Sequence, residues 1–243
     1  MIAKEMSTNQ HITDFHSFLS QVDNSYHERI AKIDLFDTNK TKNWNAGQKK
    51  KFAAVFYHLR GYFIEFMWYL ANFAEDERIK KIVIDNITEE LGMGTKFSHE
   101  ALYERFAKAC GVDIHEEILS KTHYLPFAKE FNHTHIRWLK EHDPLSRFAA
   151  FAAYERLDNI DYRNLFDFVR TLDLPSKAHA FFRVHVFVEH FESTFDLLME
   201  IWRECPEKVI NAFQFIYSHQ YNMWQNLSDA IFKDVKIASP VAP

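Results

Sequence analysis

The chain has 243 residues, a hydrophobic content of 47% and a formal net charge of −5, from 29 basic and 34 acidic residues. This composition supports a full core, argues against disorder, and provides no basic surface for nucleic acid. Two cysteines form neither a disulfide framework nor a zinc pattern, and no run of about 18 apolar residues predicts a membrane span. We therefore expect one cytoplasmic domain over residues 1–243, with its core from about 10 to 233, that binds neither nucleic acid nor membranes.

Apolar residues recur at helical spacing along almost the whole chain, beginning with Ile12, Phe15 and Leu19. This spacing predicts helices over 12–30, 49–74, 76–91, 98–110, 126–142, 145–157, 175–202 and 206–232, with short helical pieces at 114–119 and 159–172. Glycine and a capping serine set the ends, as at Gly92 and Ser98. No run of β-branched residues between turns predicts a strand. The sequence thus predicts a single all-α bundle of about eight helices.

One predicted helix carries three candidate metal ligands, His185, Glu189 and Glu192. Their spacing of i, i+4 and i+7 places them within an arc of roughly 60° on a helix. Imidazole and carboxylate groups together are typical ligands of iron and manganese. Acidic residues also continue nearly the same line beyond Glu192, so a solvated acidic stripe explains the pattern as well.

Three further candidates lie on other predicted helices. Glu155 follows a surface of small and aromatic residues, Glu90 precedes the break at Gly92, and His99 begins the next helix. Each one alone is equally consistent with a surface charge or a core histidine. Combined with the previous three, they make two histidines and four carboxylates on four helices, which is the ligand inventory of a dinuclear iron site. The hard carboxylates favour iron or manganese over zinc.

The order of these motifs resembles that of the heme-oxygenase-like superfamily, which includes TenA thiaminase II, the quinone synthase PqqC and CADD-like iron-containing oxidases. The motifs that carry the resemblance are Asn86 to Gly92, His99 to Gly111, Tyr154-Glu155, and Phe181-Phe182-Arg183-Val184-His185 followed by Glu189 and Glu192. The iron-containing branch, the heme-oxygenase-like di-iron oxidases, usually has aspartate where this chain has Glu189 and a third histidine where it has Glu192. The resemblance implies two iron ions, with manganese as an alternative and no heme, on the ligands Glu90, His99, Glu155, His185, Glu189 and Glu192.

The resemblance also implies an activity, a non-heme O2-dependent oxidase or oxygenase that acts on a small organic substrate in the core of the bundle. Tyr62, Glu65, Phe66 and Phe182 are expected to line the substrate pocket, although aromatic residues at helical spacing also build plain core. The expected partners are the substrate and O2, and a homodimer stays open. Two alternatives remain: a metal-free enzyme of the TenA or PqqC type, and a catalytically silent ligand-binding or interaction protein.

Overall fold

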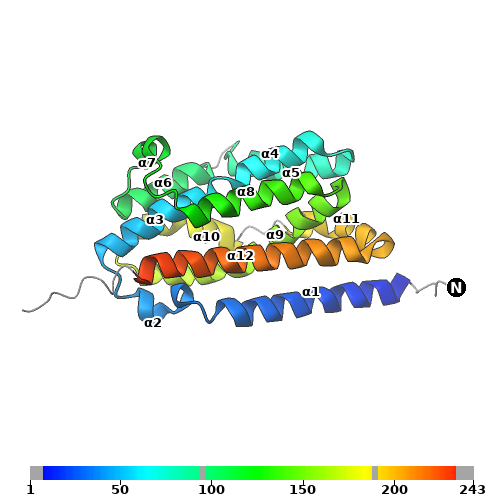
Figure 1. Cartoon of the computed structure of the whole chain (residues 1–243), viewed down its shortest axis with the longest axis horizontal. Helices are drawn as coiled ribbons and strands as arrows, with labels where there is room; N and C mark the ends of the chain where they lie inside the picture. Colours follow the sequence, from blue (N-terminus) through cyan, green and yellow to red (C-terminus); the bar gives the residue numbers. More distant parts are fainter. Residues whose placement is uncertain (1–7, 94–96, 188–190, 234–243) are drawn as a thin grey trace, which may run out of the picture.

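The computed structural model describes residues 8–93, 97–187 and 191–233, with side chains from residue 14 onward (Figure 1). The described residues form helices and no strand, which confirms the all-α class. The helices are α1 (Thr8–Ile30), α2 (Thr38–Thr41), α3 (Ala46–Arg60), α4 (Phe63–Phe73), α5 (Glu77–Glu90), α6 (His99–Ala109), α7 (Ile114–Ser120), α8 (Pro126–Glu141), α9 (Pro144–Thr171), α10 (Ala180–Phe187), α11 (Phe191–Glu204) and α12 (Pro206–Lys233). The described part thus has more helices than the eight expected, partly because several are short.

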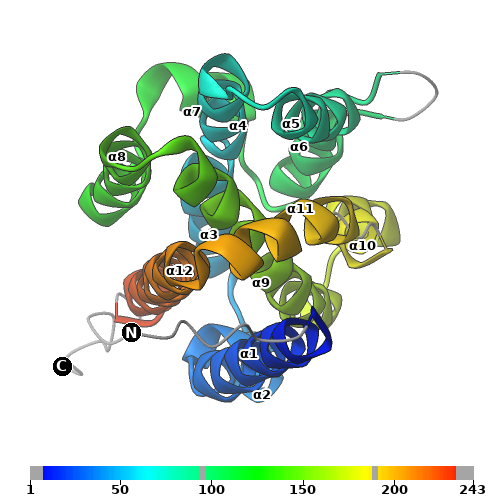
Figure 2. The ribbon, with the colours of Figure 1, turned by 90° about the vertical axis from the view of Figure 1, so that its right-hand side faces the viewer.

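Helix α9 lies at the centre of the molecule and is surrounded by α1, α3, α10, α11 and α12 in the end-on view (Figure 2). It begins where the Asp143 side chain accepts hydrogen bonds from the backbone of Leu145 and Ser146, with Pro144 in the first turn. The expectation of two helices, 145–157 and 159–172, is wrong. No glycine or proline interrupts the segment, and the helix continues through Asn159 for 28 residues. The side chains along α9 are therefore all positioned by one continuous helix.

The single helix expected over 49–74 is divided into α3 and α4 at Gly61 and Tyr62. Gly61 packs closely, because a Cβ there would lie 2.9 Å from the carbonyl oxygen of Tyr57. The break turns the chain between Arg60, the last residue of α3, and Phe63, the first of α4. Both of these residues line the cavity described below.

Gly92, after α5, lies against the residues that lead into α6. Gly92 has a positive φ of 66°, and a Cβ there would overlap the backbone of Phe97 and Ser98. Ser98 then caps α6 through a hydrogen bond from the backbone of Ala101. Because the backbone of Gly92 lies against that of Phe97 and Ser98, the first residue of α6, His99, lies beside the last residue of α5, Glu90.

The long helix expected over 175–202 differs at its start among the described residues. A 3-10 turn, η2 (Ser176–His179), precedes α10, and α11 begins at Phe191. Residues 188–190, which include Glu189, lie outside the described residues. The face expected for His185, Glu189 and Glu192 spans these residues, so it stays a prediction.

An aromatic cluster forms the core on one side of α10. Phe182 is fully buried, and its ring centroid lies 4.8 Å from that of Phe106 and 5.1 Å from that of Phe181. Edge-to-face pairs of this kind add stability beyond the burial of apolar area. Phe182, expected in the substrate pocket, is thus a core residue in the described structure.

Candidate metal centre

Three of the predicted ligands converge at the ends of α5, α6 and α10. Oε1 of Glu90 lies 2.7 Å from Nδ1 of His99 and 3.8 Å from Nε2 of His185. One ligand atom from each of these three residues lies within 4.8 Å of the others. One carboxylate and two imidazoles at this separation form a donor set that fits a divalent transition metal.

The imidazole of His185 is held in one orientation. Its Nδ1 lies 2.8 Å from the carbonyl oxygen of Phe181, and because a carbonyl only accepts, Nδ1 carries the proton. Tyr162 stacks on the ring, with centroids 4.0 Å apart and an interplanar angle of 15°. The lone pair of Nε2 is therefore free for a metal, and the backbone bond fixes the tautomer as second-sphere bonds do in metal sites.

Burial and electrostatics set the charges of this group. Burial and the neighbouring His99 lower the pKa of His185 to about 3, so its imidazole is neutral at pH 7, as a metal ligand must be. Burial alone would raise the pKa of Glu90. The hydrogen bond and charge of His99, with His185 and Arg60, outweigh that effect and lower it to about 2. Glu90 is therefore ionised and provides a negative charge for a cation.

A small cavity of about 40 Å³ adjoins these ligands, enough for a few water molecules or ions. Side chains from α4, α5, α9 and α10 enclose it together with Arg60 at the end of α3; the lining residues are Arg60, Phe63, Met67, Asn86, Glu90, Tyr154, Glu155, Asp158, Asn159, Tyr162 and His185. The predicted ligand Glu155 lies in this lining, with 5% of its surface exposed. The structure thus brings four of the six predicted ligands to one region.

The sequence analysis missed Asp158, which lines the same cavity. It lies three residues after Glu155, and this i, i+3 spacing on one helix is the signal that could have found it. Burial, followed by the charges of Asp161, Glu155 and Glu90, raises the pKa of Asp158 well above its usual value. Its Oδ1 accepts a hydrogen bond of 3.0 Å from Nε2 of Gln220 on α12.

Two other predicted residues lie elsewhere. Glu192 is exposed on α11 and lines an open groove of about 560 Å³ with Arg156 and Arg163, away from the cavity lining. Glu65, expected in the substrate pocket, is exposed on α4. Neither of these carboxylates therefore lines the cavity that holds Glu90 and Glu155.

Tyr62 and Phe66, also expected in the substrate pocket, line a second cavity of about 10 Å³. The two cavities share Phe63 and Tyr154, whose rings stack with centroids 4.6 Å apart. The second cavity also contacts His135, a buried residue whose Nε2 has no hydrogen-bond partner among the described residues. The stacked rings of Phe63 and Tyr154 thus lie between the cavity beside the metal ligands and the second cavity, which contacts His135.

The profile of a family described as "Iron-containing redox enzyme" matches residues 50–191, more than half of the chain. The chain belongs to this family. The match includes Glu90, His99, Glu155 and His185, and it ends one residue before Glu192. The membership confirms the resemblance to the iron-containing branch that the motifs indicate.

Solved structures confirm the fold of this family member. A CADD-like protein of unknown function from Nostoc punctiforme has a TM-score of 0.68 at 13% identity, covering 93% of this chain and 100% of that chain. A domain of unknown function with a heme oxygenase-like fold from Shewanella denitrificans has a TM-score of 0.70 at 16% identity, covering 92% and 94%. No curated protein matches the chain significantly. The chain therefore has the heme oxygenase-like fold.

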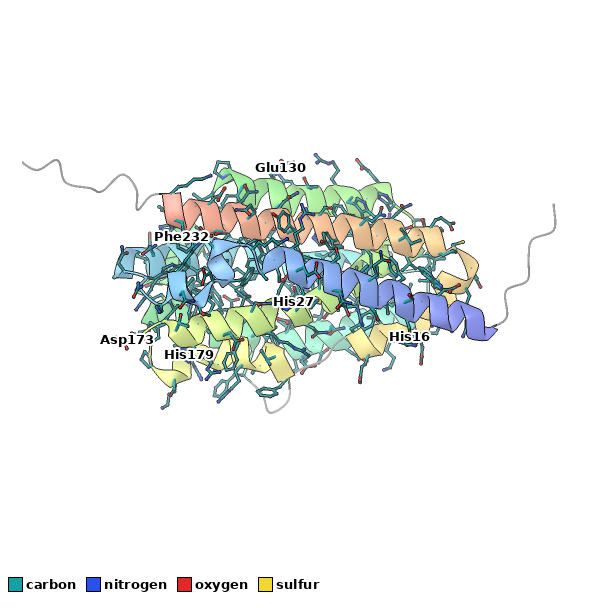
Figure 3. The ribbon with its side chains drawn as sticks, turned by 90° about the horizontal axis from the view of Figure 1, so that it is seen from below. His16, His27, Glu130, Asp173, His179 and Phe232 are labelled. Carbon is teal, nitrogen blue, oxygen red and sulfur yellow. The ribbon has the colours of Figure 1, made fainter. Side chains whose placement is uncertain are left out.

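A cysteine nucleophile and a bound heme find less support in the geometry of this family member. Burial raises the pKa of Cys110 to about 12, so its thiol is protonated at neutral pH and is a poor nucleophile. A heme would need a histidine ligand, and two histidines of α1, His16 and His27, are exposed on that helix (Figure 3). Among the described residues, no helix combines the length and apolar character needed to cross a membrane.

Proposed function

We propose that this protein is a non-heme di-iron oxidase or oxygenase that uses O2 to oxidise a small organic substrate, with manganese as the alternative metal. The observation that carries the proposal is the convergence of Glu90, His99 and His185 beside a cavity that Glu155 also lines. The family membership adds that relatives contain iron and perform redox chemistry. Carboxylates and neutral imidazoles are the donors that iron and manganese accept.

When iron is bound, it supplies the electrons and the open coordination positions that reaction with O2 requires. The protein's own residues prepare the site. The Phe181 carbonyl and the ring of Tyr162 hold the His185 imidazole in place, and the Glu90 carboxylate remains ionised in an interior position. The small volume of the cavity limits the water that reaches it.

The proposed substrate is small and at least partly apolar. The chamber beside the metal-ligand cavity is lined mainly by aromatic and aliphatic groups, including Tyr62 and Phe66, and its free polar atom is Nε2 of His135. Burial lowers the pKa of His135 well below its usual value, so the ring is neutral and provides no charge for an anionic group. Because this chamber has a volume of only about 10 Å³, a substrate group would enter it only after its aromatic lining moves, and the lining then favours an uncharged group.

The test is iron content and O2 consumption after anaerobic loading with Fe(II). We expect the wild-type protein to retain iron through desalting and to consume O2 in proportion to that iron. His185→Ala should lose most of the iron while keeping its helical content, and His16→Ala is the matched control because His16 is exposed on α1. Absence of retained iron in the wild type would contradict the proposal and favour the metal-free enzyme or the binding protein.

A further inference from the structure

We propose that Asp158 is a metal ligand, which together with Glu155 holds a second cation across the cavity from Glu90, His99 and His185. The inference rests on the proposed function, since it names a ligand of the same centre. It also means that Glu192 is not required for the second cation.

The positions of the two carboxylates on α9 support this assignment. Glu155 and Asp158 are three residues apart on one continuous helix, so their side chains project from neighbouring points of one face. Both line the cavity that Glu90 and His185 line from α5 and α10. A dinuclear site needs ligands on both sides of a metal pair about 3.5–4 Å apart. Glu90, His99 and His185 provide one side, and α9 provides the other.

The charge balance of the cavity points to a bound cation. Three carboxylates, Glu90, Glu155 and Asp158, line this space, and Arg60 is the one cationic side chain in its lining among the described residues. Arg60 already forms an ion pair of 3.0 Å with Glu100, outside this lining. Several carboxylates in one interior cavity are stable only when protons or cations compensate them. Two divalent ions would compensate all three, and the adjacent histidines make a metal the chemically matched choice.

The surroundings of Asp158 resemble those of a positioned ligand. Gln220, which is fully buried on α12, donates its amide hydrogen to Oδ1 of Asp158 at 3.0 Å. Outer hydrogen bonds of this kind orient metal-binding carboxylates. Gln220 is therefore a positioning residue: it orients the Asp158 carboxylate and does not itself contact the cation.

The surroundings of Glu192 differ in each of these respects. Its side chain is exposed, and it lines an open groove that also holds Arg156 and Arg163, outside the cavity of Glu155 and Asp158. It is therefore the matched control for Asp158: a carboxylate that the motif predicts as a ligand and that lies outside the cavity.

The experiment compares metal stoichiometry in wild type, Asp158→Asn and Glu192→Gln after anaerobic loading with Fe(II) or Mn(II), by elemental analysis. We expect about two metal ions per chain in wild type and Glu192→Gln, and about one in Asp158→Asn. Electron paramagnetic resonance of the Mn(II)-loaded proteins should show an exchange-coupled pair in the first two and an isolated ion in the third. Asp158→Glu restores a carboxylate and should recover part of the second ion.

The outcomes separate this inference from the function on which it rests. If wild type retains no metal, the proposed function fails. If wild type and Asp158→Asn retain the same number of ions with the same resonance spectrum, only the assignment of Asp158 fails. Loss of one ion from Glu192→Gln but not from Asp158→Asn also overturns it. Circular dichroism of each variant shows whether the helices are intact. Gln220→Leu tests the assignment without changing any ligand: we expect it to weaken the binding of the second ion and to leave the binding of the first unchanged.

Discussion

At the scale of single residues, the interior contains an acid outside the cavity whose titration affects stability. Asp161 on α9 is fully buried, and its Oδ2 accepts hydrogen bonds from Tyr26 and from the indole of Trp224. Its other oxygen, Oδ1, is buried without a hydrogen-bond partner among the described residues. Burial raises the pKa of Asp161 to about 7, although the two hydrogen bonds lower it in part.

This raised pKa predicts a pH dependence of stability. In the unfolded chain an aspartate titrates near pH 4 (about 3.9), so between pH 4 and 7 the folded state binds a proton that the unfolded state has lost. The stabilisation is complete below pH 4 and disappears as the pH rises through about 7. We expect the free energy of unfolding of wild type to fall, relative to Asp161→Asn, by up to about 1.4 kcal/mol per pH unit between pH 5 and 7.

Urea unfolding of the metal-free proteins at pH 5, 6, 7 and 8 measures this difference. Asp173→Asn, a change at an exposed aspartate, is the control and should differ from wild type by a constant amount. A constant difference for Asp161→Asn as well would show that the carboxyl group of Asp161 titrates in its usual range.

At the scale of elements, the ends of helices position the ligands, and glycines decide where those ends lie. Gly92 after α5 and Gly111 after α6 both have positive φ, 66° and 80°. A Cβ at Gly92 would overlap the chain that leads to His99, whereas a Cβ at Gly111 would have nothing within 4 Å. Substitution of Gly111 by alanine therefore tests backbone strain alone, whereas the same change at Gly92 adds steric overlap to that strain.

We expect Gly111→Ala to cost about 1–2 kcal/mol of stability, from the left-handed backbone alone. Gly92→Ala should cost at least about 2–3 kcal/mol, because overlap adds to that strain, and it should also weaken iron binding by displacing His99 from Glu90. Chemical denaturation and anaerobic iron titration measure the two effects. Equal losses of stability and equal iron affinity in the two variants would contradict this role of the α5 to α6 connection.

Helix α10 provides a second element-scale prediction. Phe182→Ala should destabilise the protein by about 3–5 kcal/mol, because it removes a fully buried ring from the aromatic core. Glu65→Ala, at an exposed position of α4, should remain within about 0.5 kcal/mol of wild type. Thermal unfolding of the metal-free proteins compares them. A small effect of Phe182→Ala would mean that its ring lines an open pocket, as the sequence suggested.

At the scale of the whole molecule, the candidate ligands connect α5, α6, α9 and α10, so metal binding should stabilise the complete fold. A ligand that binds only the folded state adds about 2.7 kcal/mol when its concentration is 100 times Kd. We expect Mn(II), added without O2, to raise the melting temperature of wild type but not of His185→Ala. An equal rise in both proteins would place the stabilising ion outside the proposed centre.

The sequence predicted the helical class because apolar periodicity depends only on local spacing. It predicted Glu90 and His99 as candidates from the break and cap between their helices, and Glu155 from the small and aromatic surface before it. It placed Glu192 with His185 by assuming a regular helix between them; residues 188–190 lie outside the described residues, and the Glu192 side chain lines the open groove with Arg156 and Arg163. Asp158 was missed because its contact with the cavity depends on how α9 packs against α5 and α10. The i, i+3 spacing from Glu155 marks Asp158 as a neighbour on one helix, but which face of that helix meets the cavity is a property of the tertiary structure.

The central claim is that a metal binds between Glu90, His99 and His185, and anomalous diffraction at the iron absorption edge from crystals loaded anaerobically with Fe(II) tests it most directly. The account predicts an anomalous peak within coordination distance of all three side chains, and a second peak near Glu155 and Asp158. Iron that binds elsewhere, or a cavity without an anomalous peak in iron-loaded crystals, would contradict it.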